Sequence, residues 1–71
     1  MDVQKKVGKV IRDLRIKNNL SQESFASRVG IHRTYIGMIE RGEKNITVST
    51  LSKIAKGLNV HAWQIIKKAG L

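Results

Sequence analysis

Hydrophobic residues recur at helical spacing near the N-terminus of this chain. The stripe consists of Val3, Val7, Val10, Ile11 and Leu14. Most neighbours in it are three or four positions apart, which places them on one face of a helix predicted over roughly residues 2–17. Lysines and arginines fill the opposite face. Asn18 and Asn19 follow the stripe, and asparagine tolerates the left-handed conformation in which many helices end.

A short pattern that marks helix starts then returns four times. In each copy a hydrophobic residue precedes a capping position, and a second hydrophobic residue follows five positions after the first. The copies are Leu20-Ser21…Phe25, Ile31-His32…Ile36, Ile46-Thr47…Leu51 and Val60-His61…Ile65. This hydrophobic staple predicts helices that start near residues 22, 33, 48 and 62. The first and third copies offer favoured N-caps, whereas the second and fourth place a histidine there, which is a weaker cap.

Alternation typical of a β-strand never extends beyond three or four residues. The best candidate, residues 46–48, is better explained by the third staple. The sequence therefore predicts an all-α fold, a compact five-helix domain that spans residues 1–71 as one unit. A domain of this length buries only about 60% of the surface of its unfolded chain, so we expect modest stability unless the chain associates.

Two of the predicted helices are joined so tightly that they form a helix-turn-helix. Gly30 and Ile31 separate them, and glycine adopts a left-handed conformation at a helix end without strain. Helices joined by so short a turn cross at a steep angle and need a small residue where they touch, which Ala26 supplies. Ile36 follows six positions after Gly30, on the inner face of the next helix. This spacing is typical of a DNA-binding helix-turn-helix.

The second helix of this pair begins with residues that do not favour a helix start, since a cation such as Arg33 opposes the helix dipole there. A recognition helix enters the major groove of DNA with its N-terminus first. Arg33 would then bind guanine through two hydrogen bonds, worth about 1–3 kcal/mol of discrimination. Thr34 would touch a thymine methyl group or a base edge. Tyr35 would bind a phosphate or sugar; the alternative is a half-buried ring whose hydroxyl reaches water.

Charge supports a polyanionic partner. Fourteen Lys and Arg face five Asp and Glu, which gives a formal net charge of +9. A compact polyanion, such as double-stranded DNA, is the natural partner of so basic a small domain, and a merely solubilising surface is the alternative. We expect no membrane contact, because the hydrophobic face of the first helix is needed for the core and no stretch approaches the roughly 18 apolar residues of a span. The chain has no cysteine, so it has no disulfide and no thiolate zinc site.

Residues 21–47, SQESFASRVGIHRTYIGMIERGEKNIT, resemble the helix-turn-helix domain of phage repressors and Cro proteins. The resemblance runs from about Val7 to Ile66 and implies the lambda-repressor-like fold. Within this family, HRTYI and IERGEKN are most similar to the controller proteins of restriction–modification systems, in which HRTYI and ERGxRN recur. Phage and plasmid regulators share parts of the motif.

The resemblance also implies site residues. Gln22 corresponds to a glutamine that binds phosphate at a helix start, where a plain solvated side chain is the alternative. Lys44 and Asn45 stand where controller proteins have an arginine–asparagine pair, and lysine, which lacks the planar fork, favours phosphate over base contact. Thr47 is expected chiefly to cap its helix. The candidate DNA contacts are Gln22, Arg33, Thr34, Tyr35, Met38, Arg41, Lys44, Asn45, Thr47 and Thr50.

Other residues are expected to be structural or to join two subunits. The family implies a partly buried ion pair between Arg15 and Glu40, and dimerisation largely through the last helix. The structural candidates are Arg15, Ala26, Gly30, Ile36 and Glu40. The candidates for the dimer interface are Val60, Trp63, Ile66 and Leu71. A two-fold dimer would place its recognition helices about 34 Å apart on a pseudo-palindromic operator.

The function implied is that of a homodimeric transcription regulator that binds its own promoter in the bacterial cytoplasm, near the nucleoid. A controller protein would activate its own gene together with the endonuclease gene and repress at high occupancy, and a contact with RNA polymerase is a further expectation. The alternatives are a phage or plasmid repressor, or an antitoxin that binds DNA secondarily. We expect no enzyme, cofactor or metal, because neither histidine has a nearby pair of carboxylates or a spaced set of ligands.

Overall fold

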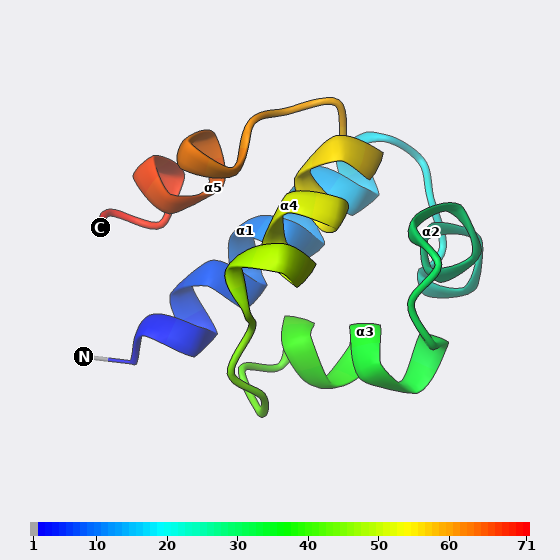
Figure 1. Ribbon diagram of the computed structural model, residues 1–71, viewed down its shortest axis with the longest axis horizontal. Coiled ribbons are helices and arrows are strands. Elements are labelled where there is room, and N and C mark those ends of the chain that lie inside the picture. The colour runs from blue at the N-terminus through cyan, green and yellow to red at the C-terminus, as the bar shows by residue number, and fades with distance from the viewer. Residues whose placement is uncertain (1) are drawn as a thin grey trace.

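Residues 2–71 are described by a computed structural model, in which they form five helices and no strand (Figure 1). The helices are α1 (Val3–Lys17), α2 (Gln22–Val29), α3 (Arg33–Glu40), α4 (Val48–Gly57) and α5 (Ala62–Lys68). The all-α prediction is confirmed. The four helix starts predicted from the staples, near residues 22, 33, 48 and 62, are each confirmed to the residue.

The residues before these helices cap them as their chemistry allows. The hydroxyl of Ser21 accepts the backbone N–H of Ser24 at 3.0 Å, and that of Thr47 accepts the N–H of Thr50 at 3.1 Å. His32 accepts the N–H of Thr34 through Nδ1 at 3.2 Å. At α5 the backbone N–H of the capping histidine instead donates to the side chain of Gln64. Serine, threonine and one of the two histidines therefore cap their helices through the side chain, and at α5 the chain uses Gln64 as well.

Every helix contributes one large, fully buried side chain to a single core. These residues, from α1 to α5, are Ile11, Phe25, Ile36, Ile54 and Ile65. Ala26 is also buried, as expected for the residue at the tight turn between α2 and α3. The predicted stripe of α1 is wrong only at Val3, which is 47% exposed; Val7, Ile11 and Leu14 are buried and Val10 packs against the core. Val3 is the first residue of α1, and Figure 1 shows that the start of α1 lies at the edge of the molecule.

The helices meet in pairs that place α3 at an outer edge of the molecule. α1 packs against α3 and α5, whereas α4 packs against α2 and α5. α2 and α3 pack against each other, and α3 forms the lower edge in Figure 1, while α5 lies at the upper left. Gly30 ends α2 with φ at 71°, which confirms the left-handed conformation predicted for it. None of the helices within residues 2–71 has the length and hydropathy of a membrane span.

A close approach between α1 and α3 was not apparent from the sequence. Gly8 lies directly under the last turn of α3, and a Cβ atom at this position would lie 2.3 Å from the carbonyl oxygen of Ile39 and 2.8 Å from that of Glu40. Glycine therefore lets the backbones of the two helices touch. This contact fixes the C-terminal end of α3 against α1.

Candidate nucleic-acid interface

The first turn of α3 presents two side chains outward and turns two inward. Arg33 and Thr34 are exposed, whereas Ile36 belongs to the core. Tyr35 is half-buried and packs against the core, and its hydroxyl forms no hydrogen bond with the described residues. This placement fits the alternative interpretation, a half-buried ring whose hydroxyl reaches water. Met38, one turn on, is also half-buried. Arg33 and Thr34 are thus the side chains of this turn that are free to approach a ligand.

Arg33 is held by a carboxylate of the neighbouring helix. Its Nη1 lies 3.0 Å from Oε2 of Glu23, which stands in the first turn of α2. Both side chains are more than half exposed, so solvent screens the pair and it adds little to stability. Sequence reasoning missed Glu23, because an acidic residue in the first turn of a helix is ordinary there. The guanidinium can exchange this partner for an acceptor on a ligand.

Behind this surface, a buried polar network joins α1, α2 and α3. Arg15 donates two hydrogen bonds to the carboxylate of Glu40, at 2.7 and 3.0 Å, and a third to the carbonyl of Leu20 at 2.7 Å. Arg15 is 9% exposed and Glu40 is 7% exposed, so the expected ion pair is present and deeply buried. Gln22 adds its amide N–H to Glu40 at 3.0 Å. The side chain for which the resemblance implied phosphate binding is therefore anchored internally.

The segment between α3 and α4 carries further polar groups. Arg41 and Glu43 form an exposed pair with N–O distances of 2.9 and 3.2 Å. The hydrogen bond and the charge of Arg41 lower the pKa of the Glu43 carboxyl, and Glu43 raises the pKa of the Arg41 guanidinium by the same two causes. Lys44 and Asn45 are exposed, and the Asn45 carboxamide oxygen accepts a hydrogen bond from Gln4 in α1. No sequence pattern pointed to Gln4.

The first turn of α4 completes this side of the molecule. Thr47 caps α4, as predicted, and its hydroxyl also bonds that of Thr50 at 3.0 Å. Thr47 is exposed and Thr50 half-buried. Figure 1 shows α3 along the lower edge of the fold, with its start beside α2, and at its other end the segment of residues 41–46 leads to the start of α4.

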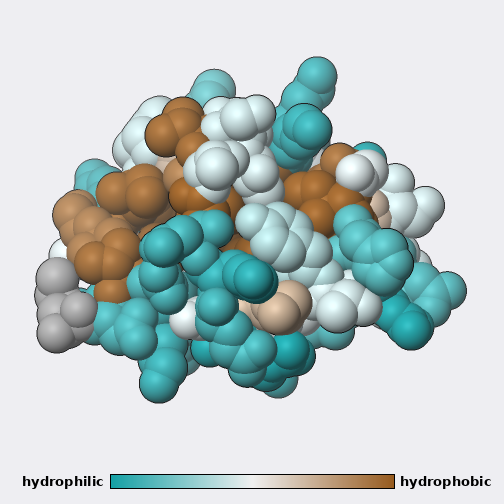
Figure 2. Space-filling model, turned by 60° about the horizontal axis from the view of Figure 1, so that its bottom comes forward, coloured by the Kyte–Doolittle hydropathy of each residue, from teal (hydrophilic) through white to brown (hydrophobic). Residues whose placement is uncertain are grey.

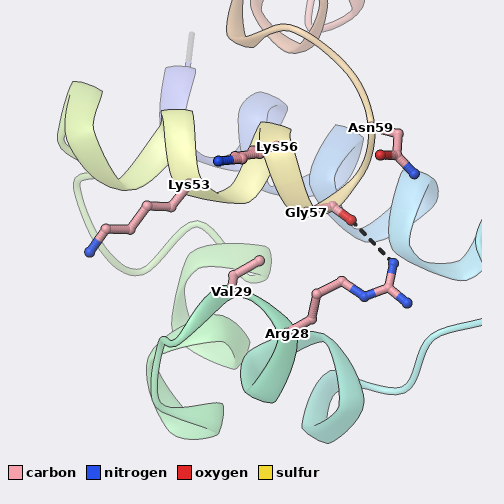
Figure 3. A pocket seen from close by; sticks show the side chains of 6 residues that line it. All are labelled: Arg28, Val29, Lys53, Lys56, Gly57 and Asn59. Carbon is pink, nitrogen blue, oxygen red and sulfur yellow. Dashed lines mark hydrogen bonds between the residues drawn. The ribbon is translucent and has the colours of Figure 1, made fainter.

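A second basic region lies between α2 and α4, where a pocket is lined by Arg28, Val29, Lys53, Lys56, Gly57 and Asn59. Figure 3 shows that its cations do not converge, because Arg28 and Lys53 extend in opposite directions. The Arg28 guanidinium lies 3.5 Å from the carbonyl oxygen of Gly57, at the end of α4. The arrangement ties α2 to α4 and does not form a cage for an anion. In the described part of the chain no cluster of His, Asp and Glu is suited to hold a metal ion.

The residues expected at a dimer interface lie at the other end of the molecule. Trp63 is 60% exposed, and its ring stacks on that of His61 with 6.4 Å between centroids. Leu71 is exposed, whereas Val60 and Ile66 are partly buried against the core. Figure 2 shows hydrophobic residues gathered at the left end of the molecule, the end at which Figure 1 places the start of α1 and α5. This end leaves hydrophobic surface in contact with solvent.

Comparisons with known proteins agree with this geometry. The model of the helix-turn-helix family matches residues 11–62. The chain is 45% identical to the control protein C.SmaI of Serratia marcescens, over all of this chain and 84% of that protein. It is 44% identical to the control protein C.BamHI of Bacillus amyloliquefaciens, over 83% of this chain and 74% of that protein.

The solved structures give the same result. The crystal structure of the restriction–modification controller protein C.AhdI from Aeromonas hydrophila superposes with a TM-score of 0.85 at 34% identity, over 87% of this chain and 94% of that one. The wild-type controller protein C.Esp1396I has a TM-score of 0.87 at 33% identity, over 97% and 88%. The chain belongs to the helix-turn-helix family and, within it, to the controller proteins of restriction–modification systems, which are DNA-binding transcription regulators.

Proposed function

We propose that this controller protein binds its own promoter as a homodimer and reads the sequence there with α3. The observation that carries the proposal is the outward exposure of Arg33 and Thr34 at the start of the second helix of a helix-turn-helix. A helix that enters the major groove by its N-terminus presents these positions to base edges. The proposed activity needs no cofactor and no catalytic step. A dimer bound at a promoter in the bacterial cytoplasm would lie next to RNA polymerase.

Each remaining contact follows from the chemistry of its side chain. Lys44 would neutralise a phosphate as a point charge, since it is exposed and forms no ion pair within residues 2–71. The first N–H groups of a helix have no acceptor within the helix, so the start of α2 would suit a phosphate. The Gln22 side chain would stiffen that turn through Glu40. Phosphate contacts set the position of the protein on DNA, whereas Arg33 would specify the sequence. Tyr35, Met38, Arg41, Asn45, Thr47 and Thr50 complete the proposed surface.

Binding to the DNA upstream of the gene tests the proposal. A titration with that DNA and with a scrambled duplex is expected to show a strong preference for the first, which Arg33→Ala reduces by roughly ten- to a hundredfold, the equivalent of one bidentate contact to guanine. Affinity is expected to fall steeply with salt, with a log–log slope near −0.9 for each neutralised phosphate.

The matched control is Glu23→Gln, which removes the partner of Arg33 but leaves the arginine in place. It is expected to retain most of the preference, because Arg33 still contacts guanine, and to raise the affinity for the scrambled duplex, because Arg33 then has no competing carboxylate. Equal affinity of the wild type for both duplexes, unchanged by Arg33→Ala, would mean that the charge of +9 binds DNA without regard to sequence, and the proposed function would be abandoned.

The dimer would be held by the exposed hydrophobic residues of the C-terminal segment. Trp63→Ala is expected to weaken dimerisation roughly thirtyfold or more, as the loss of a large aromatic contact at an interface does. Analytical ultracentrifugation over a range of concentrations measures the change. Ile16→Ala is the control, since Ile16 is a similarly exposed hydrophobic residue (48%) on α1. If the two variants change the dissociation constant of the dimer equally, or if neither changes it, the result contradicts an interface at α5.

A further inference from the structure

Three residues near the start of α1 support the segment that leads from α3 to α4. Gln4, Lys5 and Gly8 share one side of α1, since Gly8 lies four positions after the first and three after the second. Gly8 meets the last carbonyl groups of α3, as described above. Lys5 and Gln4 continue this contact toward the segment that follows α3. The proposed DNA-binding segment of residues 41–46 is therefore built on α1.

The contact between Lys5 and this segment involves the backbones of both. Gly42 has φ at 74°, and a Cβ atom on it would lie 2.7 Å from Cα of Lys5 and 2.9 Å from its backbone nitrogen. Only a glycine fits at this distance and in this conformation. Gly42 is thereby fixed against the first turn of α1, and the exposed residues that follow it project from a fixed point.

Asn45 is the exposed member of this segment whose side chain α1 also holds. The amide N–H of Gln4 donates to the Asn45 carboxamide oxygen, across 41 positions of sequence. The Asn45 side chain has no other hydrogen bond among the described residues. One acceptor position of its oxygen is used by Gln4, whereas neither hydrogen of its NH2 group has a partner among the described residues, so the NH2 group has the larger unused capacity and can only donate.

We propose that Gln4 is a positioning residue for DNA recognition, which fixes the Asn45 side chain so that its NH2 group donates to an acceptor on DNA. This inference rests on the proposed function, because it requires Asn45 to contact DNA. The acceptor is either a phosphate oxygen or an acceptor atom on a base edge, and both present the same chemistry to an NH2 group. A fixed rotamer also removes part of the conformational entropy that binding would otherwise cost.

A double-mutant cycle tests this role. Gln4→Met keeps the length and the helix propensity of the side chain but forms no such hydrogen bond. Its effect on operator binding is measured in the wild type and in Asn45→Ala. We expect Gln4→Met to weaken binding by roughly three- to tenfold, as the loss of one net hydrogen bond does. In Asn45→Ala the same substitution is expected to change nothing further.

The control and a second readout separate positioning from general effects. Lys6→Ala, two positions after Gln4 and on the exposed side of α1, is expected to act additively with Asn45→Ala. Thermal unfolding of Gln4→Met is expected to match the wild type, since the lost hydrogen bond lies at the surface. Repeating the cycle on operators varied at single positions identifies the acceptor: a coupling confined to one position indicates a base edge, and a uniform coupling indicates a phosphate.

Additive effects of Gln4→Met and Asn45→Ala overturn the inference, as does a lowered melting temperature that accounts for the loss of binding. Neither result contradicts the proposed function, which depends on the preference of the wild type for its operator and on Arg33. If the wild type binds its operator no more tightly than a scrambled duplex, the proposed function itself fails. Measuring the wild type on both duplexes within the cycle shows which of the two proposals has failed.

Discussion

Replacing Glu40 by alanine is expected to remove most of the free energy of unfolding of this protein. The substitution leaves the Arg15 guanidinium buried without its carboxylate and removes the acceptor of Gln22. Removing one partner of a buried ion pair costs about 3–5 kcal/mol. The total stability of a small domain lies near the lower end of about 5–15 kcal/mol, so this loss consumes most of it. Urea unfolding followed by circular dichroism measures the change.

The chain contains its own control for this experiment. Glu43 also pairs with an arginine, Arg41, at 2.9 Å, but both side chains are about half exposed. Glu43→Ala is therefore expected to leave the unfolding midpoint nearly unchanged, because water solvates the freed guanidinium. Equal losses in the two variants would show that charge balance, rather than burial, governs the cost of breaking these pairs.

The second large effect is expected at Gly8, where alanine would drive α1 away from α3. The added Cβ would meet two backbone carbonyl groups at 2.3 and 2.8 Å, and backbone atoms at a helix end cannot rotate aside. We expect a loss of at least about 2 kcal/mol, in the upper range for overpacking, even though alanine favours a helix by about 1 kcal/mol over glycine. Operator affinity is expected to fall as well, because the same contact supports α3.

Gly37→Ala is the matched control, since it adds the same methyl group to another buried helical glycine. A Cβ atom at Gly37 would meet only the tips of two side chains, Nη1 of Arg41 at 3.1 Å and Oε1 of Gln22 at 3.6 Å. Side-chain tips can shift, so the free energy of unfolding is expected to stay the same or rise by up to about 1 kcal/mol. Thermal melts of both variants decide the comparison; similar melting temperatures would refute the close approach at Gly8.

Local patterns predicted the fold well because they record interactions within one turn of helix. Each staple combines a cap with two hydrophobic residues that meet across that cap, so it located the start of its helix. The helix-turn-helix followed in the same way from the small residue at 26 and the left-handed glycine at 30. Such features need no knowledge of which helix packs against which.

Contacts between distant segments could not be predicted in this way. The role of Gly8 could not be predicted, because nothing in its sequence neighbours shows that the end of α3 rests on it. The hydrogen bond from Gln4 to Asn45 spans 41 positions and involves two common polar residues. Only the packing of α1 on α3 brings them together, and this packing is a property of the whole fold.

The pair between Arg33 and Glu23 gives the proposed reading of DNA an internal competitor. On a random sequence the guanidinium would keep its carboxylate, and phosphate contacts alone would hold the protein. At a guanine two acceptors would replace that carboxylate, so the arginine would change partners only there. Wrong sites would then gain little from Arg33, and the protein would leave them quickly. A weak surface ion pair would in this way shorten the search for an operator among a genome of near matches.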